Sequence, residues 1–105
     1  MSDIATLNDN FRRSFINGEV LLSAGIAAMS SEDKANIVSL VQHFDDFNEG
    51  NDVYGEHDFG SFDYKGNKIF WKIDYYDEKM YGGSENPADP TKTTRILTIM
   101  LAEDW

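Results

Sequence analysis

The sequence predicts an α+β fold in which two helices pack on an antiparallel sheet of three or four strands. Apolar residues recur at helical spacing in residues 3–16 and again from about residue 30 to residue 47. After residue 58 the apolar period changes to two, which is typical of half-buried strands. The chain has 105 residues and no linker or repeat, so we expect a single domain over residues 1–105.

The first predicted helix covers residues 3–16 and ends at Asn17-Gly18, a common stop signal. Its expected core face consists of four apolar residues: Ile4, Leu7, Phe11 and Phe15. Residues 19–23, EVLLS, predict a short strand. Residues 24–29, AGIAAM, have an ambiguous pattern, and a turn of helix is one of the structures that it allows.

Ser30 or Ser31 is the predicted N-cap of the second helix, because Asp33 follows in near capping-box spacing. This helix is expected to run to about Phe47. Its predicted core face is Ile37, Leu40, Val41 and Phe44.

The segment KGNK separates two alternating runs, residues 59–64 and 68–76, and therefore predicts a hairpin with Gly66-Asn67 as its loop. The expected core face of this hairpin is Phe62, Tyr64, Ile69, Trp71, Ile73 and Tyr75. Both prolines fall in residues 77–91, which predict a long loop. Residues 94–102 are almost continuously apolar, so they predict a central or well-covered strand.

The formal net charge is −10, from 19 acidic and nine basic residues. Such a surface repels nucleic acid and anionic membranes and attracts basic partners, although solubility alone is an alternative reason for it. The chain lacks cysteine, which excludes disulfides and thiolate metal sites. No apolar run approaches a membrane span and residues 1–10 do not resemble a signal peptide, so we expect a soluble cytoplasmic protein.

Residues 45–63 hold seven acids and no Lys or Arg in 19 positions. Same-face strand residues recur every ~6.6 Å, about two of the ~3.4 Å steps between phosphates on one DNA strand. An acidic face of this kind suits a protein groove built for nucleic acid. A solvated acidic loop and a calcium site at Asp45, Asp46, Glu49 and Asp52 are the alternatives. The candidate partner-binding acids are Asp45, Asp46, Glu49, Asp52, Glu56, Asp58 and Asp63.

His57 is the candidate for chemistry, because histidine is the usual general base and a carboxylate can orient it. In the predicted register Asp74 lies diagonal to His57 on the same face of the hairpin, and this position allows a contact between the two side chains. An enzyme or metal site centred on His57, Asp58 and Asp74 is therefore one alternative, and a structural hydrogen-bond network is the other. No nucleophile motif, phosphate loop or metal-binding spacing occurs, so we expect no enzyme and no cofactor.

The long loop carries Met80 and Tyr81 beside Gly82-Gly83. Met and Tyr favour interfaces, so these two residues are further candidates for partner binding. They are equally compatible with packing over the sheet. A housekeeping interaction module centred on them is a third functional reading, and either a monomer or a homodimer fits the sequence.

Four stretches resemble a known family: LNDNFR, NDVYGEHDFGSF, IFWKIDYYD and ENPADPTKTTRILTIMLAEDW. The chain looks like a member of a family of small acidic bacterial and phage-borne proteins known only as a domain of unknown function. The resemblance covers nearly the whole chain, with Val53 where members typically have proline. It implies a small single-domain protein of the bacterial host cytoplasm, associated with bacteria and their mobile elements, and it implies no activity.

Charge, size and that setting together favour a non-enzymatic binding protein. Its most concrete form is a phage-type inhibitor of a nucleic-acid-handling defence complex, such as an anti-CRISPR or anti-restriction protein. The partner is then a protein complex with a basic nucleic-acid-binding groove, and the chain itself binds neither nucleic acid nor membrane.

Overall fold

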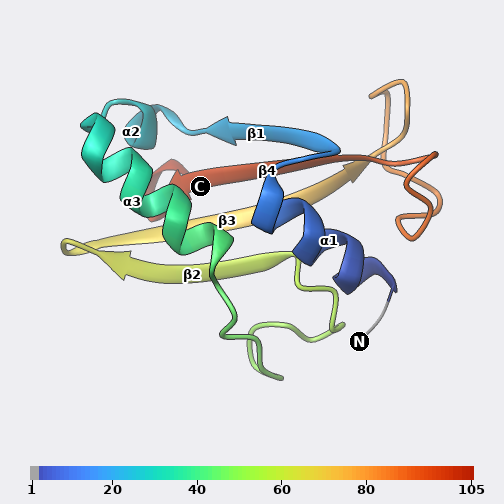
Figure 1. Cartoon of the computed structure of the whole chain (residues 1–105), viewed down its shortest axis with the longest axis horizontal. Coiled ribbons are helices and arrows are strands. Elements are labelled where there is room, and N and C mark those ends of the chain that lie inside the picture. Colours follow the sequence, from blue (N-terminus) through green and yellow to red (C-terminus); the bar gives the residue numbers. More distant parts are fainter. Residues whose placement is uncertain (1–2) are drawn as a thin grey trace.

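The structure, a computed structural model, describes residues 3–105. It is an α+β fold with a four-stranded sheet in the order β1-β4-β3-β2, and α1 and α3 cross in front of that sheet in Figure 1. The elements in chain order are α1 (Asp3–Ser14), β1 (Gly18–Leu22), α2 (Ala24–Ala27), α3 (Ser31–Gln42), β2 (Phe59–Tyr64), β3 (Asn67–Tyr76), β4 (Thr94–Leu101) and a closing 3-10 turn, η1 (Ala102–Asp104).

Strand β4 lies in the middle of the sheet, as its apolar sequence predicts. It pairs antiparallel with β3, from Ile69 opposite Leu101 to Tyr76 opposite Thr94. On its other edge it pairs in parallel with β1, where Gly18 lies opposite Arg95. The sheet is therefore mixed, and the prediction of a purely antiparallel sheet was wrong. The chain returns to β1 only after two helices and a hairpin, and such a distant pairing leaves no local sequence signal.

The β2–β3 hairpin forms as predicted, but its turn is Lys65-Gly66 instead of Gly66-Asn67. Both turn residues have positive φ, 48° and 83°, which is what a two-residue type I′ turn requires. Phe62 consequently lies opposite Ile69, and Gly60 lies opposite Trp71. The register differs from the predicted one by two residues, so every side chain keeps its predicted face while its cross-strand partner changes.

The core lies between this hairpin, β4 and the helices. It is built from the following buried residues: Phe11, Ile26, Ile37, Val41, Ile69, Trp71, Ile73, Leu97, Ile99 and Leu101. Trp71 is the largest of the fully buried side chains, and Gly60 makes room for it. A Cβ at position 60 would lie 2.4 Å from the indole Nε1 of Trp71.

Helix α3 begins as predicted, because the Ser30 hydroxyl accepts a hydrogen bond from the Asp33 amide at 3.0 Å. It ends at Gln42, about five residues before the predicted end at Phe47. Ile37 and Val41 are buried as predicted, and Phe44 packs against the core. Leu40 is exposed, so its assignment to the core face was wrong.

Helix α1 buries polar residues in addition to its predicted apolar ones. Phe11 is buried and Phe15 packs partly buried against the core, whereas Ile4 and Leu7 are only partly buried. The side chains that α1 does bury are Ala5, Asn8, Asp9, Phe11 and Arg12, three of them polar or charged. The polar members of this face organise the site described below. No helix in residues 3–105 is long and apolar enough to cross a membrane.

Candidate functional site

The segment from Asp45 to Asp58 connects α3 to β2 without forming a helix or strand. Two asparagine side chains hold its first part. The Asn48 Oδ1 accepts hydrogen bonds from the Gly50 amide at 2.8 Å and the Asn51 amide at 3.2 Å. The Asn51 side-chain amide donates to the carbonyl of Asp46 at 2.7 Å. The side chains of Asp45, Asp46 and Glu49 stay exposed, and we call these three residues the acidic patch.

Phe47 anchors the same segment to the core. Its ring lies flat against the imidazole of His57, with centroids 3.9 Å apart and an interplanar angle of 2°. It also meets Phe44 and Trp71 edge-on, at centroid distances of 5.2 and 6.1 Å. The aromatic side chain of Phe47 therefore points into the protein, whereas the side chains of Asp45 and Asp46 before it face solvent.

His57 holds the end of the segment. Its backbone lies in the left-handed region at φ 56°, which is uncommon for a residue with a side chain. Its ring Nδ1 lies 3.0 Å from Asp9 Oδ2, and its Nε2 lies 3.5 Å from Asp52 Oδ2. Asp52 Oδ1 also accepts the backbone N–H of His57 at 3.1 Å. Because its two ring nitrogens face the carboxylates of Asp9 and Asp52, His57 has a structural role and connects this segment to α1.

Arg12 extends that network into the interior. It is fully buried, and its Nη1 lies 2.9 Å from Asp9 Oδ1. Its Nε donates to the carbonyl of Val41 at 3.0 Å, and its Nη2 donates to the carbonyl of Phe44 at 2.7 Å. Burial lowers the pKa of Arg12, and the bond to Asp9 opposes that effect. The guanidinium thus caps the carbonyl end of α3, which explains why this helix stops short of Phe47.

A second buried hydrogen-bond network is centred on Asn8, the residue before Asp9 in α1. Its Oδ1 accepts a hydrogen bond from the Arg95 Nε at 2.7 Å. Its side-chain N–H groups donate to the Tyr75 hydroxyl at 2.8 Å and to the Glu56 carbonyl at 2.9 Å. The guanidinium of Arg95 also lies over the Tyr75 ring, 5.3 Å from its centroid. The side chain of Asn8 therefore connects α1 to β3, to β4 and to the segment from Asp45 to Asp58, which we call the acidic segment.

The seven predicted partner-binding acids do not form one continuous face. The Asp52 side chain is only 7% exposed because it holds His57. Glu56 and Asp58 are half-buried, and burial is the largest cause of the raised pKa of each carboxyl group. Asp63 is exposed on β2, where it lies 3.6 Å from Lys68. Of these seven acids, only the three of the acidic patch are exposed and form no ion pair with any residue of the described range 3–105.

The predicted grouping of His57, Asp58 and Asp74 is not assembled. Asp74 pairs with Lys72 at 3.0 Å instead of approaching His57, whose carboxylate partners are Asp9 and Asp52. In residues 3–105 no group of three or more acids and histidines is arranged to hold a metal ion, the predicted calcium alternative included.

Met80 and Tyr81 lie in the other long loop, and both are exposed. The Asp77 Oδ1 accepts the amides of Lys79 and Tyr81 at 3.0 Å each, so the loop tip is a defined turn. The alternative in which these two side chains pack over the sheet was wrong, and they remain candidates for a contact.

Sequence reasoning missed Asn8 and Asp9 altogether, and it missed the burial of Arg12 and Arg95. The spacing of Asp9 and Arg12, three residues apart on one helix, is a weak signal for their ion pair. No pattern signals their burial, because charged residues are almost never fully buried unless they are paired.

A family model described as "Protein of unknown function (DUF3768)" matches residues 22–104. No curated protein and no solved structure matches the chain.

Proposed function

The chain belongs to this family of unknown function, and we propose that it is a non-enzymatic binding protein that acts through its acidic patch. The observation that carries the proposal is the exposure of Asp45, Asp46 and Glu49 on a segment whose backbone is held by the Asn48 and Asn51 side chains and by the stacked ring of Phe47. No Lys or Arg occurs between residues 45 and 63 to neutralise these charges.

Preorganisation supports a role in binding. The hydrogen bonds of Asn48 and Asn51 and the stacked Phe47 already order the backbone that carries the acidic patch. Because the segment is already ordered, less of its own conformational entropy is lost when a partner binds. Complementary charge also accelerates association and makes it salt-dependent.

The distribution of basic residues also supports the proposal. The charge of Arg12 is held inside by Asp9, and Arg95 is buried. Lys65, Lys68 and Lys72 are each within ion-pair distance of an acid on the hairpin or α3. Arg13 is the exposed base next to the patch, because it lines the same shallow hollow as Asp45. Arg13 thus borders the patch on the α1 side, next to Asp45.

The partner class that fits this surface is a protein with an Arg- and Lys-lined groove for nucleic acid. Such grooves bind phosphates largely through charge, and a carboxylate cluster can occupy the same positions. We therefore propose an inhibitor of a CRISPR or restriction complex as the concrete form of the function, with the acidic patch in the groove.

The test is affinity capture of the tagged protein from bacterial lysates that express CRISPR or restriction complexes, with elution in a salt gradient. The decisive variant reverses the patch: Asp45→Lys, Asp46→Lys and Glu49→Lys. The matched control reverses three exposed acids elsewhere, Glu78→Lys, Glu85→Lys and Glu103→Lys, and changes the net charge equally. We expect the patch variant to lose roughly tenfold or more in affinity, while the control loses much less.

Equal losses in the two variants would show that overall charge matters and the patch does not. Capture that resists salt and is lost in Met80→Ala and Tyr81→Ala would instead support an interaction module centred on the loop of residues 77–93. Asp52 is left unchanged in these variants because it holds His57, so its loss would disturb the fold.

A further inference from the structure

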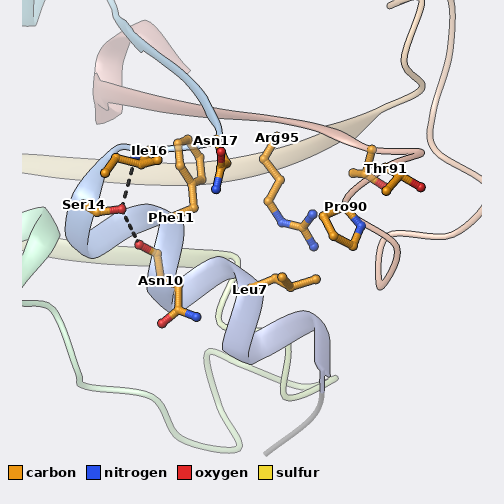
Figure 2. A pocket seen from close by; sticks show the side chains of 10 residues that line it. Leu7, Asn10, Phe11, Ser14, Ile16, Asn17, Pro90, Thr91 and Arg95 are labelled. Carbon is orange, nitrogen blue, oxygen red and sulfur yellow. Dashed lines mark hydrogen bonds between the residues drawn. The ribbon is translucent and has the colours of Figure 1, made fainter.

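A cavity of about 450 Å³ lies between α1, the residues that join α1 to β1, and the segment that precedes β4. Its apolar walls are Leu7, Phe11, Ile16 and Pro90, and the guanidinium of Arg95 reaches into it from β4. Figure 2 shows the tip of Arg95 near Leu7 and Pro90, with Asn10 and Ser14 farther along α1. None of its lining residues belongs to the acidic patch, so the cavity is separate from the surface of the proposed function.

Arg95 is a buried cation without a carboxylate partner. It is 4% exposed, and within residues 3–105 it forms no ion pair with an acid. Its Nε donates to Asn8 and its Nη2 donates to the carbonyl of Pro87, and both acceptors are neutral. These bonds use two of the five N–H donors of a guanidinium. Arg12, the other fully enclosed arginine, has Asp9 at 2.9 Å, so the two buried arginines differ in their counter-ions.

The surroundings of Arg95 favour the arrival of an anion. Burial lowers the pKa of Arg95, whereas Tyr75 and Glu56 at longer range favour the charged form. Buried charges in proteins are normally paired, because an uncompensated charge in a low-dielectric site is costly. An anion in the cavity would supply the missing counter-charge, and the fork geometry of a guanidinium suits a carboxylate.

The far wall of the cavity is organised in advance. The Ser84 and Thr93 hydroxyls lie 2.7 Å apart, and Thr93 Oγ1 donates to the carbonyl of Asn86 at 2.9 Å. The Thr91 amide donates to Asp89 Oδ1 at 2.9 Å, which fixes the turn beside Pro90. Ligand sites of small molecules are usually largely preformed, apolar in their walls, and about 300–1,000 Å³ in volume.

The chemistry of the walls selects the ligand class. One guanidinium balances one negative charge, and the net charge of −10 repels polyanions such as nucleotides. The apolar side chains that surround the rest of the space suit a hydrocarbon body. We propose that this cavity binds a small organic monocarboxylate with an apolar body, whose carboxylate pairs with Arg95.

The experiment is a titration of the 15N-labelled full chain, followed by two-dimensional NMR, with 4-methylpentanoate and benzoate. The matched ligands are 4-methylpentanamide and benzamide, which keep the apolar body and lack the charge. With the two carboxylic acids, we expect saturable chemical-shift changes at the backbone N–H signals of Asn10, Asn17 and Thr91. The two carboxamide ligands should bind at least roughly tenfold more weakly than the acids. Binding of the amides as tightly as the acids would overturn the role of Arg95.

Arg95→Gln tests the arginine directly, but loss of a buried side chain can unfold the domain. A pair of variants at the exposed residue Asn10, which lines the cavity, avoids this problem. Asn10→Asp should weaken binding of the acids severalfold and Asn10→Lys should strengthen it, because a nearby charge acts on the ligand in opposite directions. Equal affinities of these two folded variants would overturn the proposal.

The same carboxylate chemistry also occurs at the C-terminus of a peptide. An acetylated tripeptide ending in leucine, compared with its C-terminal amide, distinguishes that source. Tighter binding of the tripeptide acid than of 4-methylpentanoate would overturn the assignment to a free small acid. Weaker binding of the tripeptide would support it.

Discussion

The imidazole of His57 lies parallel to the ring of Phe47, with centroids 3.9 Å apart. The two residues are at opposite ends of the acidic segment, so their stacking closes it into a loop against the core. Asp9 and Asp52 hold the two nitrogens of the same imidazole. His57 therefore holds in place the segment that carries the acidic patch.

His57→Ala should destabilise the protein by about 1–3 kcal/mol, because it removes the stacked ring and leaves the Asp9 and Asp52 carboxylates short of a partner. Equilibrium urea unfolding measures the change. His57→Asn is the matched variant, since asparagine tolerates the left-handed backbone at φ 56° and retains polar contacts. It should lose less stability than His57→Ala. An unchanged unfolding midpoint in His57→Ala would contradict the structural role.

Asp9 and Arg12 should show strong coupling. Asp9→Ala leaves the buried charge of Arg12 without a carboxylate, and Arg12→Ala leaves Asp9 with His57 alone, so each is expected to cost about 3–5 kcal/mol. The double variant should cost less than the sum of the single variants, by at least ~1 kcal/mol in a double-mutant cycle. Additive effects would mean that the 2.9 Å contact contributes little to folding.

Gly60→Ala should destabilise the hairpin by about 1–3 kcal/mol. The new methyl group would lie 2.4 Å from the Trp71 Nε1, and this fully buried indole has little room to move. Gly82→Ala is the control, because a Cβ there meets no atom within 4 Å. It should change stability by less than about 0.5 kcal/mol. Thermal unfolding of both variants measures the difference, and similar melting temperatures would contradict the tight packing of β2 on β3.

Asp58→Asn should stabilise the protein at neutral pH. Burial raises the pKa of Asp58 and the nearby charges of Asp52 and Asp74 raise it further. A carboxyl group with a raised folded-state pKa binds more protons in the folded state than in the unfolded chain. Its contribution to stability is therefore present below the unfolded pKa of about 4 and is lost as pH rises through the folded value.

The measurement is the difference in melting temperature between Asp58→Asn and the parent protein as a function of pH. We expect a gain of a few degrees at pH 7 that shrinks as pH falls toward the ordinary carboxyl range. The exposed residue Asp46 provides the control variant Asp46→Asn, which should leave stability within about 0.5 kcal/mol of the parent. A gain in Asp58→Asn that is constant with pH would contradict the electrostatic origin.

The sequence by itself determined the local elements. The alternation of residues 59–76 predicted the hairpin and its two faces, and the face assignment survived a two-residue error in register because side chains in a strand alternate with period two. The apolar run from residue 94 predicted the central strand, and the Ser30 cap predicted the start of α3. The acidic excess between residues 45 and 63 was also visible as composition.

The tertiary structure decided which of these charges are available. Whether Asp52 faces solvent depends on His57 lying beside it, and the position of His57 depends on Asp9 in a helix 48 residues earlier. The parallel pairing of β1 with β4 and the burial of Arg12 and Arg95 depend equally on contacts between distant segments. Local patterns report only the period of one segment, whereas burial and ion pairing arise when separate segments meet, so these features follow from the fold as a whole.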